Sequence, residues 1–150
     1  MRFIGNIEAK TDSKGRVFLP AVFRKVLQAS GEENLVLRKD PFTQCLVLYP
    51  ESVWNEMIDA LCGKLSKWRA EDRQVMRQYM LESEMLALDG NGRLLIPRRY
   101  LQWAGIDQNL KFIGVDNTIE IWRKTENDQP FMDPKDFSRT LEQLMSEKTE

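Results

Sequence analysis

Alternating apolar and polar positions in the first fifty residues predict short strands around one small helix. Residues 3–10 give a weak strand signal, and residues 16–20 predict a second strand that ends at its proline, which cannot continue a β-ladder. The apolar residues that follow share one helical face, so we expect a short helix that stops at Ser30-Gly31. Residues 35–37 and 45–49 then predict two strands on either side of a hairpin loop.

Helical spacing replaces this alternation after Pro50. Apolar residues recur on one stripe between positions 53 and 61 and again between 65 and 79, which predicts two helices joined near a glycine. Trp68 falls on the second stripe, and Asp72 is its polar exception. A strand, a turn and a second strand are predicted again from about residue 84, so the chain returns to its opening pattern.

A last amphipathic helix is predicted near the end of the chain. Asp133 suits its N-cap, because an aspartate side chain can accept a backbone N–H there, and Pro134 suits its first turn. The apolar stripe behind them is formed by Phe137, Leu141, Leu144 and Met145. Acids outnumber bases after residue 126, so we expect an acidic C-terminal helix or tail.

Two segments of the chain carry nearly the same sequence. Asp12-Ser-Lys-Gly-Arg16 continues into Val17-Phe-Leu-Pro20, and Asp89-Gly-Asn-Gly-Arg93 continues into Leu94-Leu-Ile-Pro97. Asp, Gly, Arg, an apolar triplet and Pro recur in one order and at one spacing. A repeat of this kind implies two copies of one structural unit, and any functional surface should then come in two copies as well.

Each repeat offers about four short strands and one small helix, which is too little to bury a core alone. Two copies interleaved into one barrel-like body would solve this, because closure removes exposed strand edges. We therefore expect an α+β fold with pseudo-twofold symmetry. The expected divisions are a first repeat (1–50), bridging helices (51–82), a second repeat (83–126) and the acidic C-terminal helix or tail (127–150).

Composition narrows the class of protein. Hydrophobic residues make up 42% of the 150 residues and charged residues 30%, which is typical of a globular protein, and no apolar run approaches the roughly 20 residues of a membrane span. We expect Cys45 and Cys62 to be small buried residues in a reduced, cytoplasmic setting. We expect the tryptophans in the core or in subunit contacts rather than in base stacking: Trp54, Trp68, Trp103 and Trp122.

Catalytic signals are missing from the sequence. The chain has no histidine, the commonest general base, and it carries no nucleophile-elbow, metalloprotease or phosphate-loop motif. We therefore expect a protein that is not an enzyme and that has no cofactor, metal or small-molecule substrate.

Charge is distributed unevenly, although the net charge is only −1. Basic residues cluster around both repeated turns, each against a single aspartate, Asp12 or Asp89, so a basic face can exist on an acidic protein. These residues are Lys10, Lys14, Arg16, Arg24 and Lys25 in the first copy and Arg93, Arg98 and Arg99 in the second.

The repeated turn suggests a binding site with two possible readings. Aspartate and glycine favour a tight turn that would hold Arg16 or Arg93 rigidly, and a guanidinium matches guanine or a phosphate with two parallel hydrogen bonds. Lys14 adds a charge at the tip of the first turn. The alternative is that each arginine only pairs with Asp12 or Asp89 and locks its turn, and the two roles are compatible. The remaining bases, Lys10, Arg24, Lys25, Arg98 and Arg99, are either phosphate contacts or solvated surface.

Several other segments match one family pattern beside the two motifs: Phe3-Ile-Gly5, Leu46-Val-Leu-Tyr-Pro50, Trp103-Ala-Gly105, Phe112-Ile-Gly114 and Ile119-Glu-Ile-Trp122. Over about residues 1–125 the chain resembles the MraZ family of bacterial transcriptional regulators, in the AbrB-like swapped-hairpin superfamily. Two complete motifs at this spacing make the resemblance specific.

The resemblance implies a fold and a function. It implies two β-α-β half-units interleaved into a pseudo-dimeric swapped-hairpin barrel with bridging and C-terminal helices, and ring-like homo-oligomers. It also implies binding to double-stranded DNA at short direct repeats upstream of the division and cell-wall gene cluster, including the protein's own promoter. A protein of this kind would act in the cytoplasm at the nucleoid and would not associate with a membrane. By repeat position, Arg16 and Arg93 would contact DNA, Asp12 and Asp89 would orient the turns, and Lys14 would be a further contact. The alternative is a structural or protein-interaction assembly whose turns only lock the fold.

Overall fold

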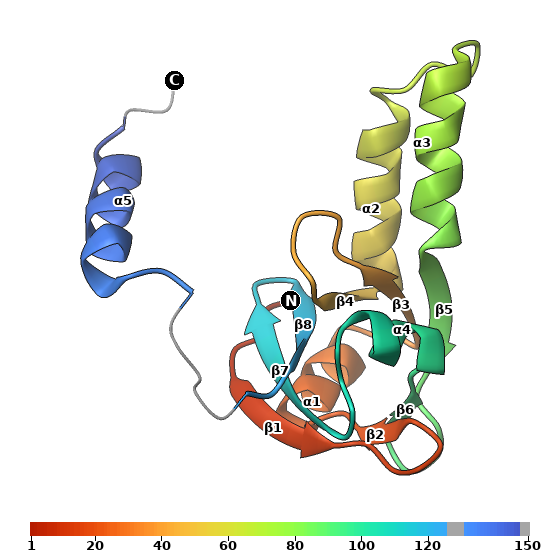
Figure 1. Ribbon diagram of the computed structural model, residues 1–150, viewed down its shortest axis with the longest axis vertical. Helices are drawn as coiled ribbons and strands as arrows, with labels where there is room; N and C mark the ends of the chain where they lie inside the picture. The colour runs from red at the N-terminus through yellow and green to blue at the C-terminus, as the bar shows by residue number, and fades with distance from the viewer. Residues whose placement is uncertain (126–130, 148–150) are drawn as a thin grey trace.

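Pairs of strands are separated by one or two helices in the computed structural model, which describes residues 1–125 and 131–147 (Figure 1). The helices are α1 (Ala21–Ala29), α2 (Glu51–Cys62), α3 (Ala70–Leu81), α4 (Arg98–Trp103) and α5 (Pro134–Ser146). The strands are β1 (Asn6–Lys10), β2 (Arg16–Phe18), β3 (Asn34–Lys39), β4 (Leu46–Pro50), β5 (Ser83–Ala87), β6 (Arg93–Leu95), β7 (Asn109–Val115) and β8 (Thr118–Arg123). The α+β class and the element order expected from the sequence are confirmed.

Most strand pairs join one repeat to the other. The larger sheet is antiparallel in the order β1-β7-β8-β4-β3-β5, and β2 pairs with β6 in a separate two-stranded ribbon. Four pairs contain one strand from each of the two repeats: β1–β7, β4–β8, β3–β5 and β2–β6. The other two pairs, β3–β4 and β7–β8, are hairpins within one repeat. Neither repeat can therefore form its sheet without the other.

The closed barrel expected from the sequence is not found in the part of the chain that the structure describes. The larger sheet ends at β1 on one side and at β5 on the other, and these two edges do not pair. The three-residue strands β2 and β6 pair with each other instead of bridging the edges. The edges are thus joined by no hydrogen-bond ladder, and the short strands form a ribbon of their own.

The apolar triplet of each motif fixes this ribbon onto the core. Val17 and Leu19 in the first copy, and Leu94 and Ile96 in the second, are buried. The aromatic residue that follows each proline is also buried, Phe23 on α1 and Tyr100 on α4, and Phe23 packs edge-on against Phe3 with ring centroids 5.8 Å apart. Because side chains alternate along a strand, the middle residue of each triplet faces outward.

Helices α2 and α3 form a hairpin that projects beyond the sheet (Figure 1). Its base packs on the sheet through α2, where Trp54 and Met57 contact a small buried cluster that contains Cys45. One sequence prediction is wrong here, because Cys62, expected to be buried, is exposed at the end of α2. Trp68 was expected in the core or in a subunit contact, and its side chain is 96% exposed, so it does not belong to the core.

Trp68 is exposed because α3 begins only at residue 70. The backbone N–H of Ser66 donates to a carboxylate oxygen of Asp72 (2.8 Å), and the N–H of Trp68 donates to the Ser66 hydroxyl (3.2 Å). Side chains therefore satisfy the backbone of a loop where a helix was expected. Asp72, the polar exception in the stripe, supports this loop.

The C-terminal helix begins as the sequence predicts. Asp133 caps α5 by accepting the N–H of Lys135 (2.9 Å), and Pro134 lies in the first turn. All thirteen residues of α5 are exposed, including its apolar stripe. Within the described residues, no helix is long and apolar enough to cross a membrane.

Candidate nucleic-acid interface

The two repeated turns have the same hydrogen-bond pattern. In the first, Oδ1 of Asp12 accepts the backbone N–H groups of Lys14 and Arg16, both at 2.9 Å, and Oδ2 accepts Nε of Arg16 at 2.7 Å. In the second, Asp89 accepts the equivalent backbone donors at 2.9 Å and Nε of Arg93 at 2.8 Å. Each aspartate therefore fixes both the turn and the direction of its arginine.

Hydrogen bonding keeps both aspartates ionised. The backbone N–H of Arg16, joined by its side chain and by the N–H of Lys14, lowers the pKa of Asp12 from 3.8 to about 2, although desolvation acts in the opposite direction. The backbone N–H of Arg93 is likewise the main cause that lowers the pKa of Asp89. The ion pairs that hold the turns thus persist throughout the neutral pH range.

Each turn also docks on the other repeat. The carbonyl of Gly15 accepts the N–H of Ile96, and the carbonyl of Gly92 accepts the N–H of Leu19, both at 3.0 Å. The glycines have φ angles of +89° and +81°, which residues with a Cβ rarely adopt. At Gly15 a Cβ would also lie 2.7 Å from the carbonyl oxygen of Ile96. The glycines are therefore required by the turn and by the junction between the repeats.

The outward face of the β2–β6 ribbon carries both arginines. Arg16 lies opposite Leu95 in the register and Phe18 lies opposite Arg93, so each arginine has an apolar partner across the ribbon. Phe18 is 58% exposed and Leu95 is 54% exposed. The guanidinium carbon of Arg93 lies 5.8 Å from the centre of the Phe18 ring. We call this set of four side chains the ribbon face.

Phe18 and Leu95 were not singled out from the sequence. Both belong to apolar triplets, and a run of three apolar residues at the end of a strand favours burial. The available signal was the alternation of side chains, because their buried neighbours Val17 and Leu94 face inward.

The guanidinium groups of the ribbon face keep free donors. Each arginine uses only Nε toward its aspartate, and neither Nη1 nor Nη2 of Arg16 or Arg93 has a hydrogen-bond partner among residues 1–125 and 131–147. The two side chains are 35% and 25% exposed. Each ion pair therefore orients a guanidinium without using the two nitrogens that could make a bidentate contact.

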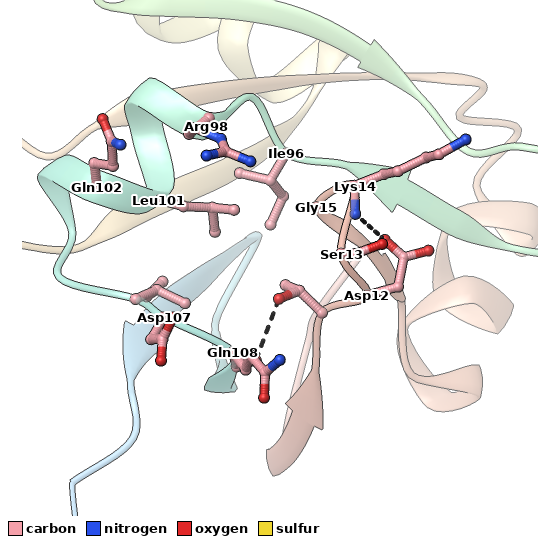
Figure 2. Close-up of a pocket in the computed structure, with 12 residues that line it drawn as sticks. Asp12, Ser13, Lys14, Gly15, Ile96, Arg98, Leu101, Gln102, Asp107 and Gln108 are labelled. Carbon is pink, nitrogen blue, oxygen red and sulfur yellow. Dashed lines mark hydrogen bonds between the residues drawn. The ribbon is translucent and has the colours of Figure 1, made fainter.

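Two hollows flank the ribbon at related positions. The first lies between the turn at Asp12–Gly15 and α4, and Arg98 and Gln102 line its helical side (Figure 2). The side chain of Lys14 points away from this hollow (Figure 2). The second hollow lies between the turn at residues 89–92 and α1, where Arg24 and Lys25 occupy the helical side.

The remaining predicted bases have different surroundings. Arg24 reaches the second turn, where Nη1 lies 3.5 Å from the carbonyl of Asn91, and Lys10 is exposed two residues before the first turn. Arg99 instead forms an ion pair with Glu84 and lies 4.9 Å from the centre of the Tyr100 ring. The structure thus brings most of the predicted basic residues to the two turns but engages Arg99 elsewhere.

No group of acidic residues and cysteines among the described residues could hold a metal ion. The two turns and the ribbon face offer guanidinium, ammonium and exposed apolar groups.

Comparison with known proteins identifies similar chains along nearly the whole sequence. A family model described as "MraZ protein, putative antitoxin-like" matches residues 3–78 and 80–147, and so includes α5. The transcriptional regulator MraZ of Phocaeicola vulgatus is 57% identical over 97% of this chain and 94% of its own length. Those of Bacteroides fragilis and Christiangramia forsetii are 54% and 31% identical, over 99% and 97% of this chain and 94% of each relative. The similarity thus extends beyond the residues 1–125 recognised from the sequence.

Proposed function

The chain belongs to the MraZ family of transcriptional regulators, which are not enzymes, and we propose that it binds double-stranded DNA through the ribbon face. The observation that carries this proposal is the presentation of two oriented arginines on an antiparallel two-stranded ribbon. The major groove of B-DNA is wide enough to admit such a ribbon. The pseudo-twofold arrangement places one arginine on each strand.

Direct base recognition follows from the groups that the ribbon face leaves free. The Nη atoms of Arg16 and Arg93 suit O6 and N7 of guanine, the commonest specific contact of arginine in the major groove. Phe18 and Leu95 suit the methyl group of thymine, which is an apolar feature of the same groove. The ribbon face therefore combines polar and apolar groups that distinguish base pairs, so the binding is sequence-specific.

Phosphate contacts are assigned to the bases beside the ribbon. Lys14 and Arg98 lie on one side of it, and Arg24 and Lys25 lie on the other. Lys10 adds charge next to the first turn. Such contacts set the position and affinity of a protein on DNA without reading its sequence. Arg99 would have to leave Glu84 to contribute.

Repeated operator sites are proposed on the basis of the family. The protein acts as a homo-oligomer, in the form of a ring, on short direct repeats upstream of the division and cell-wall gene cluster, including its own promoter. This places it in the cytoplasm at the nucleoid. Several ribbon faces on one assembly would bind several repeats at once, so that weak individual contacts add up to a stable complex. Assembly would also concentrate basic turns on a protein whose net charge is −1.

A titration with DNA tests the proposal. The purified protein is mixed with a duplex from upstream of its own gene and, separately, with a scrambled duplex of the same composition, at two salt concentrations. We expect tighter binding to the native duplex and a steep loss of affinity as salt rises, because cationic side chains release counterions from DNA. Equal binding to both duplexes, or no binding, would contradict the proposal.

A second candidate function is a protein-interaction assembly without DNA binding. The observation that favours it is that both arginines already pair with aspartates and lock their turns. Such an assembly would retard neither duplex at any salt concentration.

A further inference from the structure

The apolar stripe of α5 has no contact that covers it in the described residues. Phe137, Leu141, Leu144 and Met145 are 53%, 45%, 61% and 78% exposed. At 3.6 residues per turn these four side chains lie on one face of the helix, with Asp136 on one flank and Glu142 on the other. Covering such an exposed apolar face with the apolar groups of another surface lowers the free energy, because apolar area is removed from water.

A matching surface lies on the α2–α3 hairpin. A groove of about 410 Å³ is lined by the end of α2, by the loop that follows it and by α3. Its apolar lining comes from Leu65, Met76 and Met80, together with the exposed thiol-bearing residue Cys62. Methionine side chains adapt to the shape of what they contact, which is common at surfaces that receive a helix.

The charges around the two surfaces are complementary. Lys67, Arg73 and Arg77 line the groove, and none of them has an ion-pair partner in the part of the chain that the structure describes. The acid of the groove, Asp72, is already held by the N–H of Ser66. Of the two carboxylates that flank the α5 stripe, Asp136 already pairs with Arg139, whereas Glu142 has no ion-pair partner among the described residues. Glu142 would face the unpaired cations of the groove, which favours this pairing over a random apolar contact.

We propose that α5 of one copy of this chain docks in the α2–α3 groove of a second copy. The groove and the helix occur on the same chain, so every copy both offers and receives one helix. Its own α5 does not occupy the groove of this chain, since every residue of α5 is exposed. Such a head-to-tail contact uses two different surfaces and therefore repeats from copy to copy, closing into a ring when the rotation allows it.

The inference extends the proposed homo-oligomer by naming its contact, and it does not depend on DNA binding. It also gives the C-terminal helix a role. The helix would be an assembly element of the molecule, separate from the ribbon face, and the carboxylate of Glu142 would favour docking in the basic groove.

Cys62 provides the test, because it lines the groove and the other cysteine, Cys45, is buried. We would introduce Leu144→Cys on the stripe and oxidise the full-length protein mildly. We expect a disulfide between copies that disappears in the Cys62→Ser background. The matched control is Ser146→Cys, which lies two residues further along on the opposite face of α5 and should form little of this product.

Other patterns would overturn the inference. A disulfide within one chain would mean that α5 docks on its own hairpin. A disulfide that persists in Cys62→Ser would mean that two α5 helices pair with each other. Equal yields from both engineered cysteines, or no disulfide at all, would mean that the groove does not receive this face.

Mass measurement separates this inference from the proposal of an oligomer. Light scattering of Leu141→Glu/Leu144→Glu should show smaller species than the unmodified protein, and the variant should keep its fold because neither residue is buried. An unmodified protein that is monomeric would contradict both proposals. An oligomer whose mass is unchanged by the substitutions would leave the assembly in place and overturn only this contact.

Discussion

Arg16→Ala and Asp12→Asn change opposite ends of one ion pair, and the proposed site requires them to affect DNA binding very differently. Arg16 donates through Nε to Asp12 at 2.7 Å, while its two Nη groups have no partner among the described residues. Arg16→Ala removes the whole guanidinium group, including both free Nη groups. Asp12→Asn keeps an oxygen that can accept the two backbone N–H groups of the turn, but it removes the charge that pairs with Nε.

The size of each effect follows from these contacts. A bidentate contact to guanine is worth about 1–3 kcal/mol, so Arg16→Ala should weaken specific binding about 5- to 150-fold per site. Asp12→Asn leaves both Nη groups in place and removes a negative charge near the DNA phosphates, so its loss of affinity should be much smaller. Arg16→Lys keeps the positive charge but removes the planar guanidinium group. The variant should therefore still bind the scrambled duplex but lose its preference for the native duplex.

Fluorescence anisotropy with the native and scrambled duplexes measures these affinities, and thermal unfolding of each variant measures stability beside them. The expected result is similar unfolding temperatures for Arg16→Ala and Asp12→Asn with clearly different affinities. The same comparison at Arg93 and Asp89 tests the second copy. Equal losses of affinity from both ends of the pair, in parallel with equal losses of stability, would refute base recognition and leave the arginines as turn locks.

Three further outcomes are expected. Both Gly15→Ala and Gly92→Ala should lose about 1–2 kcal/mol of stability through backbone strain. Gly15→Ala should lose about 1–2 kcal/mol more, because its methyl group would meet a backbone carbonyl, whereas the methyl group at position 92 would meet the flexible side chain of Arg24. Equal unfolding temperatures of the two variants would contradict the close contact of Gly15 with the second repeat. A thiol reagent at pH 8 should modify only Cys62 in the folded protein, because burial raises the pKa of Cys45 to about 12; reaction of both thiols before unfolding would show that Cys45, directly before β4, is accessible in the folded protein. The carboxylate of Asp12 should titrate near pH 2 by NMR. Its contribution to the stability of the folded protein is therefore complete above about pH 4 and is lost as the pH falls toward 2. A titration midpoint near 3.8 would show that Asp12 does not hold the hydrogen bonds of the turn.

Local elements were predictable because each repeat carries residues that mark the ends of strands and helices. Aspartate and glycine define the turns, and the prolines that end β2 and β6 precede α1 and α4 as expected. The burial of Phe23 and Tyr100 follows from their place on one face of these helices. The expectation that the repeats interleave is also met, because neither copy has enough apolar surface alone.

Features that depend on the whole fold could not be predicted in this way. The open sheet arises because β2 and β6 pair with each other, and periodicity carries no information about which strands meet. Trp68 fits a helical stripe, but the side chains of Asp72 and Ser66 accept backbone N–H groups there and stabilise a loop. Phe18 and Leu95 are apolar and yet exposed, since a short ribbon has only one covered face.

The most direct test of the central claim is to locate the DNA on the protein. A photoactivatable phenylalanine analogue is placed at Phe18 on the ribbon face or, as a matched control, at Phe42 in the exposed loop between β3 and β4, which lies away from the ribbon (Figure 1). Irradiation with the labelled native duplex should crosslink DNA through position 18 and not through position 42. Crosslinking through position 42, or a protein that binds the duplex without crosslinking at position 18, would contradict the claim that the ribbon face meets DNA.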